Sequence, residues 1–301
     1  MKPFKTLLLA ALFLSTTCFG QTYLFKVLAS KGTNQVKSSS ESSWRPIKTG
    51  SGLMSGDELK VPQNAYLGLV HTSGKTIELK TADQVNVDEL AANIKLKSTV
   101  ASKYADFVLN KLLEDKSEIK DKLVVTGAVI RASEVYSIKV QMPLFVEVLR
   151  SEVLVKWEPV KEGNHTYVTT LKNIFNEVIY QGETKDTEIT LDLSHPRFVN
   201  ERLIVFSVAS KEDPNFKSEE YGIKRLSPNT FIKVKQDLDQ LNKVIGDETS
   251  LNHIMMAAYY EENNLIVNAI TSFEKAIELS PDVQDFSDMY DAFLERNNLK
   301  N

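Results

Sequence analysis

The sequence is almost free of cysteine. Among its 301 residues the one cysteine is Cys18, close to the N-terminus. If the N-terminal segment is removed after export, the remaining chain has no disulfide, no thiol nucleophile and no thiolate metal ligand. We therefore expect the stability of the mature chain to come from burial alone, and to be the same with and without a reductant.

The sequence also lacks the spacings that usually mark catalytic or metal sites. Its four histidines, His71, His165, His195 and His253, are all more than five residues apart, and no His-Glu-x-x-His motif occurs. There is no glycine-rich phosphate loop before a helix and no Gly-x-Ser-x-Gly nucleophile motif. We expect His165 and His195 to be solvated loop residues and His253 to be a packing or surface residue. No cofactor and no metal site is predicted.

The charge shows no positive excess. The formal net charge is −4, which does not favour a nucleic acid as partner. Adjacent carboxylates such as Glu261 and Glu262 are typical of a charged helix face. A hydrolase with two carboxylates converging in a cleft stays open as an alternative, because spacing in the sequence does not show which residues converge. We predict that the protein is not an enzyme.

Long hydrophobic runs are absent except at the N-terminus. Lys2 and Lys5 precede the apolar run Thr6–Leu14, which is too short to span a bilayer and is followed by mostly small or polar residues. This order predicts a signal peptide over residues 1–20, with cleavage after Gly20. The mature chain is then periplasmic or secreted, with no transmembrane span.

Lipid anchoring at Cys18 is the alternative. A lipidation signal needs a leucine three positions earlier and a small residue just before the cysteine, where this chain has Ser15 and Thr17. These residues favour the cleaved and soluble form.

Residues 21–98 have the pattern of short strands separated by turns. Phe25 and Val27 alternate with other residues, as do Leu67 and Leu69, which is typical of half-buried strands. Glycines between the strands are expected to adopt positive φ at the corners. A tryptophan precedes a glycine, a leucine and a Gly-Asp turn, and a strand pair closed by a glycine turn follows. The residues in this order are Trp44, Gly50, Leu53, Gly56, Asp57, Gly74, Ile77 and Leu79.

This order resembles the periplasmic domain of FecR-type regulators over residues 22–98. The resemblance implies a small β domain. Those regulators carry a cytoplasmic segment and a membrane span before this domain, whereas the present chain is expected to have only a cleavable signal there. Sigma-factor regulation is therefore not carried over.

Two segments follow with different patterns. Helical spacing over residues 99–122 predicts a connecting helix. Residues 123–226 return to alternation and predict an immunoglobulin-like β-sandwich, with turns at Gly163-Asn164, Gly182 and Asp213–Asn215. A Trp-x-Pro step at Trp157, ahead of a strand with Tyr167, resembles fibronectin type III and immunoglobulin-like domains.

Residues 227–301 are predicted to be helical. One apolar helix face is expected to consist of Phe231, Val234, Leu238, Leu241 and Ile245, and Gly246 is expected to end that helix.

An internal repeat lies within this helical segment. Residues 258–265 recur at 292–299 with an offset of 34 and five of eight positions identical, and this period is that of tetratricopeptide repeats. The segment resembles that family through Ala257, Tyr260, Ala269, Phe273, Ala276 and Pro281, while His253 stands where the family has tryptophan. Because one full repeat and a half rarely bury a core, the helices are expected to pack on the preceding helix or on the sandwich.

The expected fold class is therefore multidomain α+β. The expected function is that of an exported, non-enzymatic interaction or scaffold protein, which binds a protein partner in the cell envelope through its helical repeat. In tetratricopeptide repeats the first helix of each pair forms the binding face, and this implies Met255, Ala258 and Glu262 as contact residues. The alternative is binding of an envelope glycan by the first module, through loop aromatics such as Trp44 and Tyr66.

Overall fold

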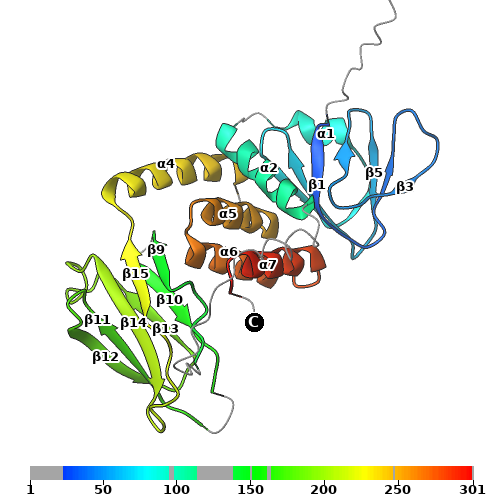
Figure 1. Cartoon of the computed structure of the whole chain (residues 1–301). Coiled ribbons are helices and arrows are strands. Elements are labelled where there is room, and N and C mark those ends of the chain that lie inside the picture. Colours follow the sequence, from blue (N-terminus) through cyan, green and yellow to red (C-terminus); the bar gives the residue numbers. More distant parts are fainter. Residues whose placement is uncertain are drawn as a thin grey trace, which may run out of the picture.

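The computed structural model describes residues 23–94, 98–113, 138–149, 151–160, 164–246 and 248–299. The expected signal peptide, with Cys18, lies outside these residues, as do residues 114–122 of the expected connecting helix and 123–137 of the expected sandwich. The protein is mixed α+β, as predicted. Two regions of β-structure lie on either side of a group of helices (Figure 1).

The N-terminal module contains two four-stranded antiparallel sheets with the orders β4-β1-β6-β7 and β3-β2-β5-β8. A short helix, α1 (Val87–Ala92), follows the last strand. The strands are β1 Phe25–Lys31, β2 Gln35–Lys37, β3 Arg45–Pro46, β4 Gly52–Leu53, β5 Glu58–Val61, β6 Tyr66–His71, β7 Thr76–Leu79 and β8 Ala82–Asn86. As expected, glycines occupy the corners with positive φ, at Gly50, Gly56 and Gly74.

Strands β1 and β6 are buried on both faces, although alternation in the sequence predicted only one buried face. Val27 and Leu69 point into the core of the N-terminal module. Leu28, Tyr66 and Val70 belong instead to a second core, which is built mainly from helices. In β1 the pairing register shifts between Val27 and Ala29, so the consecutive residues Leu28 and Ala29 both face the helical core. The first sheet is therefore shared between two layers.

Helix α2 (Thr99–Leu113) covers this second face, and Gly74 permits its close approach. Gly74 has φ +88°, and a Cβ placed there would lie 2.3 Å from the Cβ of Ala101. Any other residue would push α2 away from the sheet.

The middle module, strands β9–β15, is a two-layer β structure that we call the sandwich. It has its own core around Trp157, which is 2% exposed. One layer has the order β12-β11-β14-β15-β9, and the other pairs β10 with β13. All pairs are antiparallel except β15 with β9. The strands are β9 Phe145–Val148, β10 Glu152–Lys156, β11 Tyr167–Lys172, β12 Val178–Thr184, β13 Glu188–Asp192, β14 Leu203–Ser210 and β15 Tyr221–Arg225.

The prediction of a turn at Gly182 is wrong. Gly182 lies inside β12 opposite Thr169, and the chain reverses earlier, between Asn173 and Glu177. The side-chain oxygen of Asn173 accepts hydrogen bonds from the backbone N–H groups of Phe175 and Glu177, and Asn176 has φ +64°. Asparagine supplies both the local hydrogen bonds and the left-handed conformation that glycine was expected to supply.

Four helices follow the sandwich: α4 Pro228–Ile245, α5 Ser250–Glu262, α6 Ile266–Leu279 and α7 Gln284–Arg296. Gly246 ends α4 with φ +75°, as predicted. None of the helices within the described ranges combines the length and the apolar character needed to cross a bilayer.

The internal repeat of the sequence is reproduced in the backbone. At the end of α5, Asn264 has φ 58° and the N–H of Leu265 donates to the carbonyl oxygen of Tyr260. At the end of α7, Asn298 has φ 56° and the N–H of Leu299 donates to the carbonyl oxygen of Leu294. The repeated Asn-Asn-Leu sequence thus ends both helices in the same way.

The helices lie between the two β modules in Figure 1. Helix α5 packs on α2 and on β7, and α7 packs on β1. Helix α6 faces the sandwich through Val267, which belongs to the core of the sandwich. One face of the first sheet of the N-terminal module forms a common core with α2 and α4–α7. We call the N-terminal module together with these helices the shared unit. The sandwich is therefore inserted between two parts of the chain that pack together.

Candidate functional site

The sequence-predicted contact residues lie where α5 meets α2. Met255 and Ala258 are 0% and 3% exposed. Glu262 forms an ion pair with Lys103 of α2. Nearby, the rings of Tyr104 and Tyr259 make an edge contact with centroids 4.9 Å apart. The chain's own α2 therefore occupies the helix face that was expected to bind a partner, and Met255 and Ala258 have no surface to offer one.

The two aromatic residues expected on exposed loops of the first module differ from each other in burial. Tyr66 is 3% exposed and packs edge-on against Phe286 of α7. Burial raises its pKa, and the carboxylate of Glu78 raises it further. Trp44 lies at the surface, half-buried, with the Lys37 amine 5.3 Å from its ring centroid. Of the two, only Trp44 can present a ring face to a glycan.

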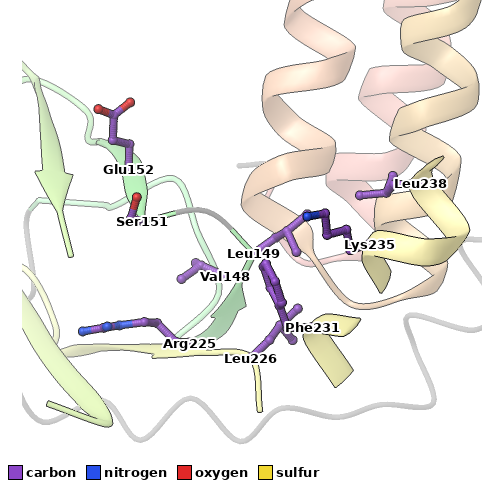
Figure 2. A pocket seen from close by; sticks show the side chains of 9 residues that line it. All are labelled: Val148, Leu149, Ser151, Glu152, Arg225, Leu226, Phe231, Lys235 and Leu238. Atoms are coloured by element: carbon purple, nitrogen blue, oxygen red, sulfur yellow. The ribbon is translucent and has the colours of Figure 1, made fainter. Parts of the chain in front are cut away.

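An open groove lies at the junction of the sandwich and α4, with a volume of about 630 Å³ (Figure 2). Val148, Leu149 and Leu226 form its wall on the sandwich side. Phe231 and Leu238 form the wall on α4. The remaining lining residues are polar or charged: Ser151, Glu152, Arg225 and Lys235.

The groove exists because the apolar face of α4 is longer than the core it packs on. The sequence predicted one face from Phe231 to Ile245. Val234, Leu241 and Ile245 are buried in the shared unit, but Phe231 remains 41% exposed. The N-terminal end of α4 thus extends past the other helices toward the sandwich. The α4 half of the groove could have been found from this apolar pattern, whereas Leu149 and Leu226 are brought there only by the tertiary fold.

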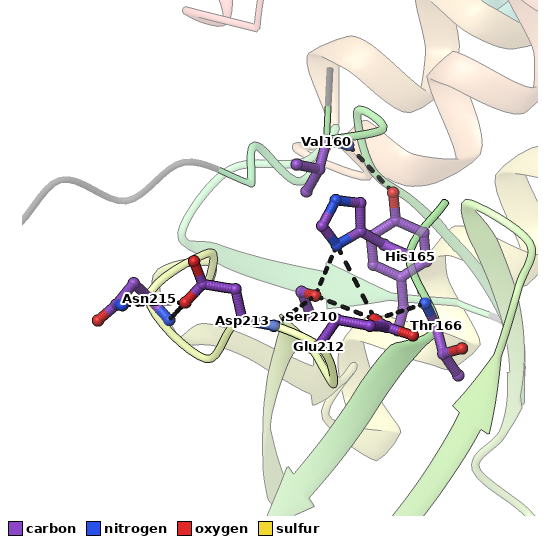
Figure 3. Close-up of polar contacts among 8 residues, drawn as sticks. Val160, His165, Thr166, Ser210, Glu212, Asp213 and Asn215 are labelled. Atoms are coloured by element: carbon purple, nitrogen blue, oxygen red, sulfur yellow. Dashed lines mark hydrogen bonds and ion pairs between the residues drawn. The ribbon is translucent and has the colours of Figure 1, made fainter. Parts of the chain in front are cut away.

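Among the described residues, His165, Ser210 and Glu212 form a group with the composition of a nucleophile, a base and an acid (Figure 3). The Nδ1 atom of His165 lies 2.7 Å from the Oγ atom of Ser210, and this hydroxyl donates to Glu212 at 3.2 Å. The side chain of His165 is only 9% exposed, so the expectation of a solvated loop residue is wrong.

The geometry of this cluster favours a structural role. Ser210 is 2% exposed, and its Oγ also accepts a hydrogen bond from the N–H of Asp213. Glu212 accepts from the N–H of Thr166 at 2.9 Å, and this hydrogen bond is the main reason that the Glu212 pKa is lowered to about 2. A nucleophile must be open to its substrate, whereas these side chains join the loop after β14 to the start of β11. We call His165, Thr166, Ser210 and Glu212 the loop clasp.

Metal ligands are not gathered in the described part of the chain. Within those residues no group of three or more His, Cys, Asp or Glu side chains is placed to hold an ion. His253, on α5, is half-buried, and burial lowers its pKa.

The sequence matches no protein-family model and no curated protein.

Proposed function

We propose that the protein is an exported, non-enzymatic interaction protein that binds a protein partner in the cell envelope. One observation carries this proposal: the hairpin between β11 and β12 holds large apolar side chains in water. Ile174, Phe175 and Val178 are 59%, 75% and 59% exposed. Exposed apolar groups that gather in one place mark interaction surfaces, because their burial by a partner is favourable.

The hairpin is built to hold these side chains in one conformation. Asn173 accepts two backbone N–H groups across the turn, and its own amide donates to the Glu177 carboxylate at 2.7 Å. A preorganised turn loses little conformational freedom on binding. Ile174 and Phe175 are thus suited to act as anchors that enter an apolar pocket of the partner.

The helical repeat has a different role in this proposal from the one that the sequence favoured. Because α2 covers the face with Met255, Ala258 and Glu262, we assign the repeat to holding the two β modules at a fixed separation. The tetratricopeptide assignment rests on the 34-residue offset and on the matching ends of α5 and α7.

The two β modules keep the assignments that the sequence favoured. An immunoglobulin-like or fibronectin-like sandwich is supported by strand order, since β10 pairs with β13 while β11, β14 and β15 form the opposite sheet. A FecR-like first module is supported by the positive φ angles of Gly50, Gly56 and Gly74. Export through a signal peptide over residues 1–20 and a periplasmic or secreted location complete the proposal.

The test is capture of partners from envelope extract by the full mature chain and by two variants. Phe175→Ser should lose the partner that the wild-type chain retains. Leu279→Ser is the matched control, because Leu279 is also an exposed large apolar residue (39%) but lies at the end of α6. A partner retained by Phe175→Ser would remove the hairpin from the binding surface. Deletion of residues 229–301 is unsuitable, because those helices share a core with the first module.

A glycan-binding first module is the second candidate, and the surface position of Trp44 favours it. Cosedimentation of the full mature chain with purified cell wall provides the test. Trp44→Ala should reduce pelleting to the level of a control protein if the ring is a sugar platform. Pelleting that is equal for both chains would exclude Trp44.

A further inference from the structure

The groove between the sandwich and α4 has the dimensions of a small-molecule site. Its volume of about 630 Å³ falls within the roughly 300–1,000 Å³ that is usual for ligand pockets. Its two walls come from different modules, with Leu149 and Leu226 on one side and Phe231 on the other (Figure 2). A ligand lying between the walls would contact both modules at once.

The α4 wall is fixed before any ligand arrives. Ser227 caps the helix by accepting a hydrogen bond from the N–H of Thr230, and Pro228 occupies the first turn. Phe231 follows directly within this capped turn. Phe231 is 41% exposed although the helix that bears it is well formed. An apolar wall that is preformed and open to solvent favours an apolar ligand body.

A cation is placed among these apolar residues. Lys235 is one helical turn after Phe231 and three residues before Leu238, so the three side chains share one stripe of α4. In Figure 2, Lys235 extends from α4 toward Leu149. The charged ends of Arg225 and Glu152 point away from Phe231, and the Arg225 guanidinium donates to the carbonyl oxygen of Phe198. The charge facing the apolar walls is therefore positive.

We propose that this groove binds an amphiphile with a single apolar chain and an anionic head group, a carboxylate or a phosphate. The chain lies between Leu149, Leu226 and Phe231, where its burial removes apolar surface from water. The head group lies beside the Lys235 amine. Because the ligand contacts α4 and the sandwich together, its binding also restrains the sandwich relative to the shared unit.

The test uses four probes of equal chain length and the full mature chain, by isothermal titration calorimetry below each probe's critical micelle concentration. Dodecanoate and dodecyl phosphate should each bind saturably at one site. Dodecyltrimethylammonium should bind about fivefold more weakly or less, and dodecyl maltoside should fall between. Stronger binding of dodecanoate identifies free fatty acids as the source of the ligand, and stronger binding of dodecyl phosphate identifies a lipid head group.

Matched variants on α4 localise the site. Phe231→Ala should weaken dodecanoate binding about tenfold, while Ile232→Ala should leave it unchanged, since Ile232 is 53% exposed but outside the groove. Lys235→Gln should abolish the preference for anionic probes, while Lys233→Gln should preserve it. All four positions are exposed, and an unchanged melting temperature would confirm that the variants fold.

Two results would overturn the proposal. One is equal affinity for the anionic and cationic probes in the wild-type chain. The other is dodecanoate binding that Phe231→Ala leaves unchanged.

Discussion

The two β modules contact the same helices through very different interfaces. The N-terminal module contributes whole strand faces to the shared unit, with Leu28, Tyr66 and Val70 buried among residues of α2 and α5–α7. The described interface with the sandwich is smaller: Leu149 and Leu226 pack against the core of the shared unit. Val267 of α6 enters the core of the sandwich, and Lys156 forms an ion pair with Glu274 of α6 at 2.9 Å. Extensive burial gives a cooperative unit, whereas a small interface permits motion between domains.

Polar contacts reinforce the interface between the N-terminal module and the helices at both ends of the loop that joins α4 to α5. The Lys75 amine donates to the carbonyl oxygen of Ile245 at the C-terminus of α4, and the Glu78 carboxylate accepts from the N–H of Leu251 at the N-terminus of α5. Each charge has the sign that complements the adjacent helix dipole. Residues more than 150 positions apart in the sequence are thereby fixed to one another, so the N-terminal module and the C-terminal helices should unfold together.

Truncating Phe286 tests this cooperativity with the largest expected effect. Phe286 is 0% exposed and packs on Tyr66 across the interface. Phe286→Ala should lower the free energy of unfolding of the shared unit by about 3–5 kcal/mol, through lost burial and a cavity. Hydrogen exchange should report faster opening of the N-terminal strands and of α5–α7 together.

The matched control for this experiment is Phe206→Ala, which removes a 0% exposed ring from the core of the sandwich. It should accelerate exchange in the sandwich alone. If Phe286→Ala left the N-terminal strands protected, the module and the helices would be separate folding units.

Asp285 provides a test of intermediate size. One of its carboxylate oxygens accepts hydrogen bonds from the N–H of Ser30 and the hydroxyl of Thr49, both at 2.8 Å. Asp285→Ala leaves these donors without their acceptor and should cost the shared unit about 1–3 kcal/mol in chemical denaturation.

Asp282, three residues earlier, is the control for Asp285→Ala. Its side chain is 78% exposed and pairs with Lys31, so Asp282→Ala should cost no more than about 1 kcal/mol. Equal losses from both variants would show that the contacts of Asp285 add nothing beyond surface charge.

Reversing the charge of Lys156 tests the weaker interface. The side chains of Lys156 and Glu274 are 29% and 35% exposed, so solvent screens the pair and it contributes about 0–1 kcal/mol. Lys156→Glu places two carboxylates together and should broaden the distribution of module separations in small-angle X-ray scattering, with little change in melting temperature. Lys172→Glu disrupts a pair within the sandwich, with Glu220, and should leave the scattering unchanged.

The sequence predicted individual elements better than the contacts between them. Periodicity located α4, and Gly246 marked its end, because both signals depend on neighbouring residues only. The repeat at an offset of 34 coincides with matching helix ends at Asn264 and Asn298. The same local reasoning expected Gly182 to form a turn, although hydrogen bonding by Asn173 decides where the chain reverses.

The contacts between distant elements could not be predicted from local patterns. Nothing in the local pattern shows that α2 covers Met255 and Ala258, since the covering helix lies about 150 residues away in the sequence. The second buried face of β6 was missed for the same reason, because Tyr66 is buried by Phe286. Phe231 was assigned to the right helix face, but its exposure depends on where the other helices end.

The smallest expected effect concerns acid and the loop clasp, which lies in the sandwich alone. The hydrogen bond from the N–H of Thr166 holds the Glu212 pKa at about 2, below its ordinary value of 4.5. A lowered folded-state pKa means that the unfolded chain binds the proton first. The carboxylate therefore contributes its full stability above about pH 4.5 and loses that contribution as the pH falls toward 2.

Between these values the melting temperature of the sandwich should fall more steeply in the wild-type chain than in Glu212→Gln, which keeps an acceptor for Thr166 but does not titrate. The amide proton shift of Thr166, followed by NMR, should titrate over the lower part of this range in the wild-type chain only. The shared unit should respond to acid identically in both chains, because it contains none of the clasp. A difference between the chains that appeared in the shared unit instead would show that the sandwich and the helices are coupled more strongly than their interface indicates.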